Sequence, residues 1–327
     1  MKPLSRDEVA AAAGVSSATV SRVYNNPSSV SAAKQRDVFE AAEKLGYIPN
    51  KSASALRRNG TGIITLVELK KEQRPYYWGD LPIFKWFYTD VLHAVKNIID
   101  ESMFQLNIAS ASDSRDITAL RGQTDGLICY DVDETAEAEM IAASNLPYVL
   151  GHHTKSFEGF NRSSTDNFEG GRLQAQLLKD TGCSSPAYIT AHLDMVQPHL
   201  DRLEGFLSVY PEHDVRIVGD GIGRTAGFRA AVEIIGKVDG IAAVNDITAA
   251  GAGYALSEAG IRVQQDIPLV GYDNMPLSIA LPFKLLSIDL RPSQIYAEAA
   301  RMLLTVLKGE NNPNPATISP TAVNLDQ

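Results

Sequence analysis

A run of small polar side chains between residues 16 and 25 offers the most specific chemistry in the sequence. Hydroxyl, amide and guanidinium groups recur there at intervals that place them on the outward face of one short helix: Ser16, Ser17, Thr19, Ser21, Arg22 and Asn25. Such groups donate hydrogen bonds to phosphate oxygens, and an arginine also reads a guanine through two parallel bonds. The residue types therefore predict a surface that contacts nucleic acid.

Two short helices are expected to position this face. Ser5 and Glu8 form an S-x-x-E capping box, which starts a first helix that runs to about Ala13. Gly14 then breaks the helical pattern, and Ser16 caps a second helix. Three valines hold that second helix from behind: Val15, Val20 and Val23.

A third helix is predicted to begin at Ser31 and to end at Gly46. Its apolar stripe consists of Val38, Ala41, Ala42 and Leu45. Helix, glycine-containing turn and polar-faced helix together form the helix-turn-helix arrangement, whose second helix enters the major groove of DNA. The alternative interpretation is a small helical hairpin with a solvated face.

Charge is divided unevenly along the 327 residues. The net charge is −9, yet residues 1–60 hold nine Lys/Arg and five Asp/Glu, hence +4, and the remainder holds 21 and 34, hence −13. A basic head on an acidic body is typical of a protein whose head alone contacts DNA, because phosphates repel the body.

Composition indicates an ordinary globular protein of two or three domains. Apolar residues make up 44% of the chain, and no apolar run approaches the roughly 20 residues that span a bilayer. The start, MKPLSRDE, has no secretion signal. Cys129 and Cys183 stand in isolation, which favours reduced thiols in a cytoplasmic protein.

The segment from Lys51 to Arg58 is basic and contains a single leucine, Leu56. A helix of two turns is marginal in water. We therefore expect a hinge that folds only on DNA, where Leu56 acts as an apolar wedge in the minor groove. The alternative is a flexible basic linker.

From Gly62 onward, short apolar runs alternate with helical stretches. The expected strands cover residues 62–69, 104–110, 126–130, 147–151, 187–191, 215–219, 240–244, 267–272 and 285–290. This alternation predicts an α/β body with parallel sheets, and two sheets with a cleft between them are expected. Ligands of such sheets bind at the carboxyl ends of the strands.

Residues 1–60 resemble the head and hinge of the lactose/galactose repressor (LacI/GalR) family of bacterial transcription regulators. The motifs that carry the resemblance are Asp7-Glu8-Val9-Ala10, Ala13-Gly14-Val15-Ser16, Thr19-Val20-Ser21-Arg22-Val23 with Asn25, Leu45-Gly46-Tyr47-Ile48-Pro49-Asn50, and Ala53 with Leu56. The resemblance implies a homodimer on a near-palindromic operator in double-stranded DNA, and a body like periplasmic sugar-binding proteins.

The resemblance also implies roles for single residues. Ser17, Ala18 and Arg22 read bases, with most of the specificity expected from Arg22, the hinge and DNA shape. The other DNA-binding positions mostly contact the DNA backbone, and the last two belong to the hinge: Ser5, Ser16, Thr19, Ser21, Asn25, Ser31, Asn50, Ala53 and Leu56. In the body, the ligand-binding arginine, asparagine and aspartate fall on Arg202, Asn245 and Asp273, and a polar contact falls on His152.

These effector-binding residues also fit the rule for strand ends, because each follows a predicted strand. A guanidinium, an amide and a carboxylate in one cleft hydrogen-bond the vicinal hydroxyls of a sugar; the alternative is a set of loop caps and ties between strands. Asp166 follows the loop after the strand at 147–151 and is expected either to contact the effector or to cap the next helix, whereas Asp246 is expected to be a cap.

The loop after the first strand departs from the family because it is long and aromatic. Its rings could form a platform for a sugar, or equally core or dimer contacts: Tyr76, Tyr77, Trp78, Phe84 and Trp86. Of these, Tyr77 and Trp78 are assigned to the effector. Ile222 and Leu290 stand where some members have an aromatic and a polar residue, which leaves the sugar unspecified.

Other patterns are weak. Residues 219–223 form a glycine-rich turn without the G-K-[ST] of a phosphate loop, and His192, Asp194 and His199 lack metal-ligand spacing. No nucleophile elbow is present. No cofactor, metal or catalytic residue is expected, and no membrane partner.

The sequence therefore predicts a ligand-responsive regulator, most simply a repressor of carbohydrate genes that a sugar releases from its operator. The alternatives are co-repression by a non-sugar metabolite and a solute-binding protein. The expected domains are a head (1–48), a hinge (49–60) and an effector-binding, dimerising body (61–327). The body divides into an N-subdomain of about 61–160 with 291–327 and a C-subdomain of about 161–290.

Overall fold

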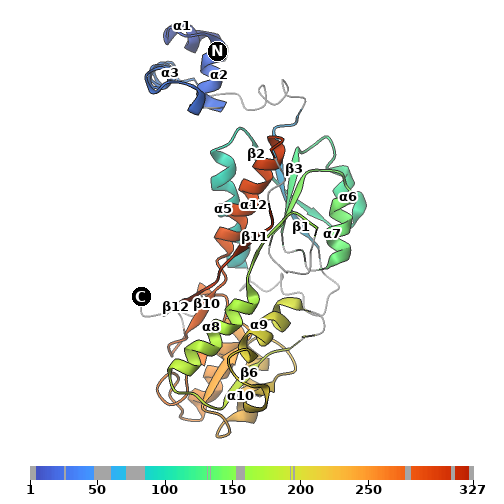
Figure 1. Cartoon of the computed structure of the whole chain (residues 1–327), viewed down its shortest axis with the longest axis vertical. Coiled ribbons are helices and arrows are strands. Elements are labelled where there is room, and N and C mark those ends of the chain that lie inside the picture. Colours follow the sequence, from blue (N-terminus) through green and yellow to red (C-terminus); the bar gives the residue numbers. More distant parts are fainter. Residues whose placement is uncertain are drawn as a thin grey trace.

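The computed structural model describes residues 5–25, 27–47, 60–70, 85–130, 132, 134–151, 159–191, 193, 196–276, 281–310 and 314–323. Within these ranges the chain forms a small helical head and an α/β body (Figure 1). None of the described helices is long and apolar enough to cross a membrane.

The head consists of three helices around a core of small apolar side chains. They are α1 (Arg6–Ala12), α2 (Ser17–Asn25) and α3 (Ala32–Leu45), with a short 3-10 turn, η1 (Pro27–Ser29), before α3. The core residues are Val9, Ala10, Val20, Val23, Val38, Ala41 and Ala42. The predicted apolar positions of the second and third helices are thus confirmed, with Val15 and Leu45 packed at the edge of the core.

The larger sheet of the body has six parallel strands in the order β11-β5-β4-β3-β1-β2. The strands are β1 (Ile63–Leu69), β2 (Gln105–Ala111), β3 (Gly126–Tyr130), β4 (Tyr148–Gly151), β5 (Arg162–Thr165) and β11 (Ala316–Ile318). Helices α5 (Lys85–Asp100) and α12 (Pro292–Leu307) pack on one face, and α6 (Ser114–Ala119) and α7 (Thr135–Ala142) pack on the other.

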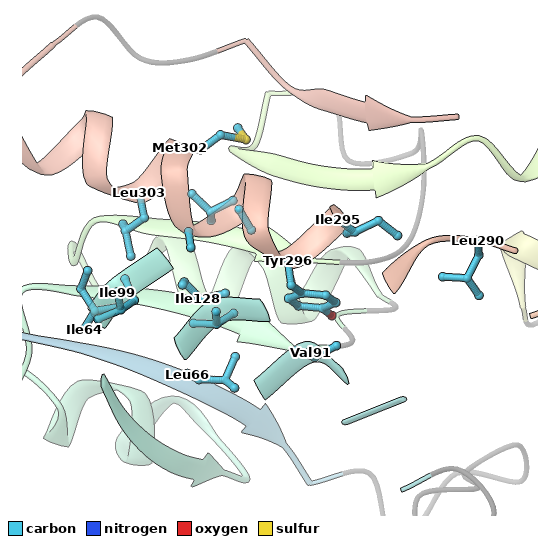
Figure 2. Close-up of a cluster of buried hydrophobic side chains, with 14 of the residues drawn as sticks. Ile64, Leu66, Val91, Ile99, Ile128, Leu290, Ile295, Tyr296, Met302 and Leu303 are labelled. Atoms are coloured by element: carbon cyan, nitrogen blue, oxygen red, sulfur yellow. The ribbon is translucent and has the colours of Figure 1, made fainter. Parts of the chain in front are cut away.

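The core between the larger sheet and helices α5 and α12 joins segments far apart in the sequence. Figure 2 shows Ile64, Leu66 and Ile128 of the sheet facing Val91 of α5 and Tyr296 of α12. Tyr296 packs so closely on the last residue of β4 that a Cβ at Gly151 would lie 2.2 Å from its ring. The C-terminal part of the chain therefore completes the first half of the body.

The smaller sheet has four parallel strands in the order β7-β6-β8-β9. They are β6 (Pro186–Ile189), β7 (Arg216–Val218), β8 (Gly240–Ala243) and β9 (Leu269–Val270). Helices α8 (Asn167–Asp180) and α9 (Gln197–Leu207) cover one face. Helices α10 (Arg224–Ile234) and α11 (Asp246–Glu258) cover the other, and a 3-10 turn, η3 (Glu212–Asp214), precedes β7.

Glycines let both helix pairs of the smaller unit approach closely. A Cβ at Gly171 of α8 would lie 1.8 Å from the carbonyl oxygen of Arg202 in α9. A Cβ at Gly251 of α11 would lie 1.9 Å from the carbonyl oxygen of Arg224 in α10. Only glycine allows backbones this close, so these positions determine how the two helix pairs pack.

The two sheets are connected by three crossings of the chain. The first follows Thr165, because β5 still belongs to the larger sheet. The other two contain β10 (Ser287–Asp289) and β12 (Thr321–Val323), which pair antiparallel with each other. Cross-links join the crossings: the Asp166 N–H donates to the Ile318 carbonyl over 3.1 Å, and an Arg291 Nη1–H donates to the Ser319 carbonyl over 3.4 Å.

All nine strands expected from apolar runs are present, although several are shorter than expected. Strands β5, β11 and β12 were not expected, because their residues form no apolar run. The predicted fold class, a helix-turn-helix head followed by a two-sheet parallel α/β body, is confirmed.

Candidate functional site

The turn into α2 has the predicted capping chemistry. Ser16 Oγ accepts a hydrogen bond from the Thr19 N–H over 3.1 Å, which satisfies one free donor of the first helical turn. The capping box of α1 is also present: Ser5 Oγ accepts from the Glu8 N–H over 3.3 Å, and Glu8 Oε2 accepts from the Ser5 N–H over 2.6 Å. Gly14 adopts a φ of 63° between the two helices, a conformation that favours glycine.

The outward face of α2 carries the residues assigned to DNA. Ala18 and Arg22 are exposed, and Ser17, Thr19 and Ser21 are partly exposed. The Ser17 hydroxyl donates to Asp7 Oδ1 of α1, so this side chain is already oriented in the free head. Ser31 precedes α3 without making a side-chain cap bond. For Asn25 only the backbone is described, and Asn50, Ala53 and Leu56 lie outside the described residues.

In the body, Arg202 of α9 forms the centre of the candidate effector site. Its side chain is 6% exposed, its Nε–H donates to Asn167 Oδ1 over 3.0 Å, and its Nη1–H donates to the Val244 carbonyl over 2.7 Å. The guanidinium also lies flat on the ring of Tyr272, 3.7 Å from the ring centroid. A buried guanidinium held in this way is rigid.

Asp273 approaches the same guanidinium from the end of the smaller sheet. Its Oδ1 lies 3.6 Å from Arg202 Nη1, and its side chain is 14% exposed. Its backbone has a φ of 101°, and that of the next residue, Asn274, has a φ of 53°. Left-handed backbone at two consecutive non-glycine residues is strained and is characteristic of functional sites.

Asn245 takes the capping role that was expected of Asp246. Asn245 is the N-cap of α11, because its Oδ1 accepts from the Thr248 N–H over 2.9 Å. The prediction that Asp246 is the cap is therefore wrong. Asp246 instead accepts from the Met275 N–H and from the Ser287 hydroxyl, both over 2.7 Å, and so ties α11 to the strand region beyond it.

Asp246 is 1% exposed, and its pKa is raised well above the usual range by burial and, secondarily, by Asp273. Burial penalises the charged carboxylate, and the two donors compensate only in part. This carboxyl therefore acts in the packing of the smaller unit.

Asp166 also acts as a cap, because its Oδ1 accepts from the Glu169 N–H over 3.0 Å at the start of α8. Its neighbour Asn167 was missed in the sequence, although it orients Arg202 directly. Little in the sequence signals this role, because the strand that Asn167 follows, β5, has no apolar pattern. His152, Tyr77 and Trp78 lie outside the described residues.

A cavity of about 170 Å³ adjoins the Arg202 and Asp273 pair and lies against the crossings. It is lined by Asp273, Asn274, Asp289 and Arg291 together with Trp86 and Asp90 of α5. Both units and the crossings thus contribute side chains to one space. Of these residues only Asp273 was assigned to the effector from the sequence, and Trp86 was named within the aromatic loop.

Aromatic rings gather beside Trp86 in the larger unit. Phe87 lies with its centroid 5.7 Å from Trp86, 5.9 Å from Tyr130 and 6.5 Å from Tyr296. Tyr88 completes the group with a centroid 5.3 Å from Tyr130. Within the described residues, the aromatic cluster near the cavity therefore comes from α5, β3 and α12.

Comparison with known proteins accounts for both parts of the chain. The family described as "Bacterial regulatory proteins, lacI family" matches residues 7–50, and a "Periplasmic binding protein-like domain" matches residues 175–325. The HTH-type transcriptional regulator CelR of Thermobifida fusca is 29% identical over 318 residues, covering 92% of this chain and 91% of CelR. The HTH-type transcriptional repressor PurR of Aliivibrio salmonicida (strain LFI1238) is 25% identical over 321 residues, covering 93% and 92%.

Solved structures also match along nearly the whole chain. A complex of the regulator CelR with cellobiose superposes with a TM-score of 0.65 at 25% identity, and the match covers 98% of each chain. The lac repressor dimer bound to operator and the anti-inducer ONPF superposes with a TM-score of 0.65 at 23% identity, covering 99% of this chain and 98% of the repressor. These relatives are regulators, not enzymes. The chain belongs to the LacI family of bacterial transcriptional regulators, proteins that bind operator DNA in response to a small molecule.

Proposed function

We propose that this regulator binds a near-palindromic operator as a homodimer and that a carbohydrate controls that binding. The observation that carries the sugar assignment is the pairing of Arg202 with Asp273 beside a cavity that Asp273 and Trp86 line. A guanidinium and a carboxylate bind vicinal hydroxyls, and an aromatic ring packs on the apolar face of a sugar ring. The relative CelR, whose structure was solved with cellobiose, supports the same class of ligand.

On the DNA side, Arg22 is the proposed reader of a guanine, and Ser17 and Ala18 are proposed to contact neighbouring bases. Their exposure on the free face of α2 supports these roles. Leu56 is proposed to enter the minor groove of the operator. The Leu56→Ala variant should bind the selected operator more weakly in a gel-shift assay while keeping its fold by circular dichroism; unchanged affinity would exclude the wedge.

Two edge strands support the proposed homodimer. Ile108 on β2 and Ile217 on β7 are 48% and 39% exposed, and both strands lie at the edge of their sheets. Exposed edge strands with apolar side chains favour pairing with another chain, so we propose that a second copy of this protein covers these edges. Sedimentation of the wild type and of a variant with Ile108→Lys tests this, and a monomeric wild type at micromolar concentration contradicts it.

The proposed function is tested in two steps. A thermal-shift screen of neutral mono- and disaccharides identifies a ligand, because a sugar at one hundred times its dissociation constant stabilises the fold by about 2.7 kcal/mol. Selection from random duplexes then provides an operator, and binding is measured with and without that sugar. Release by the sugar shows induction, and tighter binding shows co-repression. No effect of any carbohydrate on either measurement refutes the proposal.

A further inference from the structure

The cavity beside Arg202 is lined by more carboxylates than a neutral sugar requires. Asp273 comes from the end of the smaller sheet, Asp289 from the crossing strand β10, and Asp90 from α5 of the larger unit. The cation that lines the cavity with them is Arg291. Their charges therefore decide which ligands the cavity accepts.

Two of the three carboxylates already have polar partners. Asp273 is paired with Arg202 over 3.6 Å. Asp289 accepts from the Arg291 backbone N–H over 2.7 Å and from Asn274 Nδ2 over 3.4 Å, while the Arg291 guanidinium reaches the Ser319 carbonyl across the crossing. With both arginines counted against the three carboxylates, one negative charge remains.

The third carboxylate is that of Asp90. Its pKa is raised by burial, lowered by the nearby His93 and raised again by Asp289, so Asp90 and Asp289 repel each other across the cavity. Because the two residues lie on different elements, any movement that brings α5 closer to the crossings increases this repulsion. A positive charge between them would remove it.

The arrangement fits an organic cation better than a metal ion. Among the described residues, no group of three or more His, Cys, Asp or Glu side chains lies close enough together to hold a metal. Trp86 adds an aromatic ring to the lining, and its indole N–H is shielded from solvent with no hydrogen-bond partner among the described residues. An aromatic ring beside carboxylates is a recurrent binding site for ammonium groups.

We propose that the effector is a carbohydrate bearing a protonated amine, with the amine between Asp90 and Asp289 and the hydroxyls at Arg202 and Asp273. This inference rests on the proposed function, since it names the ligand class of the same cleft. A sugar phosphate brings two further negative charges into the cavity and is rejected. A neutral sugar binds but leaves the repulsion in place.

The test uses the full-length protein and matched triplets of one sugar in three forms: glucose, glucosamine and glucose 6-phosphate, and likewise galactose, galactosamine and galactose 6-phosphate, with cellobiose and its 2-amino and 6-phosphate derivatives as the disaccharide set. Titration calorimetry at neutral pH and 0.15 M salt measures each affinity. In at least one triplet the amine should bind ten-fold or more tightly than the neutral form, and the phosphate should bind worst.

Two variants and one control assign the effect to the cavity. Asp90→Asn and Asp289→Asn should each reduce the preference for the amine over the neutral sugar toward unity. Asp100→Asn, at the far end of α5, is the matched control and should keep the full preference.

Every other outcome overturns the inference. The inference is overturned if a neutral or phosphorylated form binds more tightly than the amine in every triplet. It is also overturned if the preference for the amine survives both variants, or if no member of any triplet binds. A neutral sugar that binds and changes operator affinity, without any gain from the amine, removes this inference while the proposed carbohydrate function stands.

Discussion

Replacing Arg202 with alanine should destabilise the body far more than replacing an exposed arginine. The guanidinium is 6% exposed, donates to Asn167 and to the Val244 carbonyl, stacks on Tyr272 and lies 3.6 Å from Asp273. The Arg202→Ala variant leaves two acceptors without donors and one largely buried carboxylate without its cation. Removing one partner of a buried pair costs about 3–5 kcal/mol.

A matched control is available on the surface of the same unit. Arg229 Nη2 lies 2.9 Å from Asp220 Oδ1, but the two side chains are 56% and 71% exposed. Exposed pairs contribute about 0–1 kcal/mol, so Arg229→Ala should unfold close to the wild type. The Arg202→Ala variant should melt about 6–20 °C lower, given the usual 2–4 °C per kcal/mol for a domain of this size.

The assay is thermal unfolding followed by circular dichroism, with binding to a random-sequence duplex as a separate readout. Because the head folds around its own core, we expect non-specific DNA binding at temperatures below the transition to be unchanged. A double variant with Asp273→Asn should recover part of the loss, since it removes the uncompensated charge. If Arg202→Ala unfolds no earlier than Arg229→Ala, the description of Arg202 as a buried structural and ligand-facing group is incorrect.

Other contacts lead to three further predictions. Gly171→Ala should lower the free energy of unfolding by about 3 kcal/mol, the upper end of the usual range for overpacking, because its Cβ would meet a carbonyl oxygen at 1.8 Å. In Gly221→Ala the nearest atom to the Cβ is at 3.5 Å, so urea unfolding should show a stability near that of the wild type, and equal stability of the two variants would contradict the close packing at Gly171. Asp246 takes up a proton on folding, so its contribution to stability is largest at acidic pH and falls as the pH rises from about 3.9 toward its raised native pKa. This fall in the free energy of unfolding is at most about 1.4 kcal/mol per pH unit. Asp246→Asn should flatten the dependence of stability on pH, and an unchanged dependence would contradict the raised pKa. Ser16→Ala should lower the stability of α2 by about 1 kcal/mol, because the Thr19 N–H loses its acceptor. Hydrogen exchange of the backbone amides in the first turn of α2 should be faster than in the wild type, and an unchanged rate would contradict the role of the cap.

Local signals in the sequence were sufficient for the head. The capping box at Ser5, the cap at Ser16 and the glycine at the end of α3 act within one turn of helix, so they depend little on the rest of the fold. The valines and alanines at helical spacing then determine which faces meet. The apolar strands of the body could also be predicted from local sequence, because a short continuous run of apolar residues is typical of a buried strand.

Strand β5 shows where that reasoning ends. Its residues, Arg162-Ser-Ser-Thr165, have no apolar pattern, yet three of the four are buried. They are buried because β4 and β11 pair on either side of them, and β11 comes from the other end of the chain. No local property of this segment encodes that neighbour.

The effector site was partly predictable for the same physical reason. Strand ends in parallel sheets converge, so Arg202 and Asp273 could be proposed from their positions after predicted strands. Whether Asn245 or Asp246 caps α11 was decided only by packing, which brings Ser287 and the Met275 N–H to Asp246. The charge of the cavity was likewise decided by tertiary structure, because Asp90 and Asp289 are almost 200 residues apart and meet only where the chain crosses between the sheets.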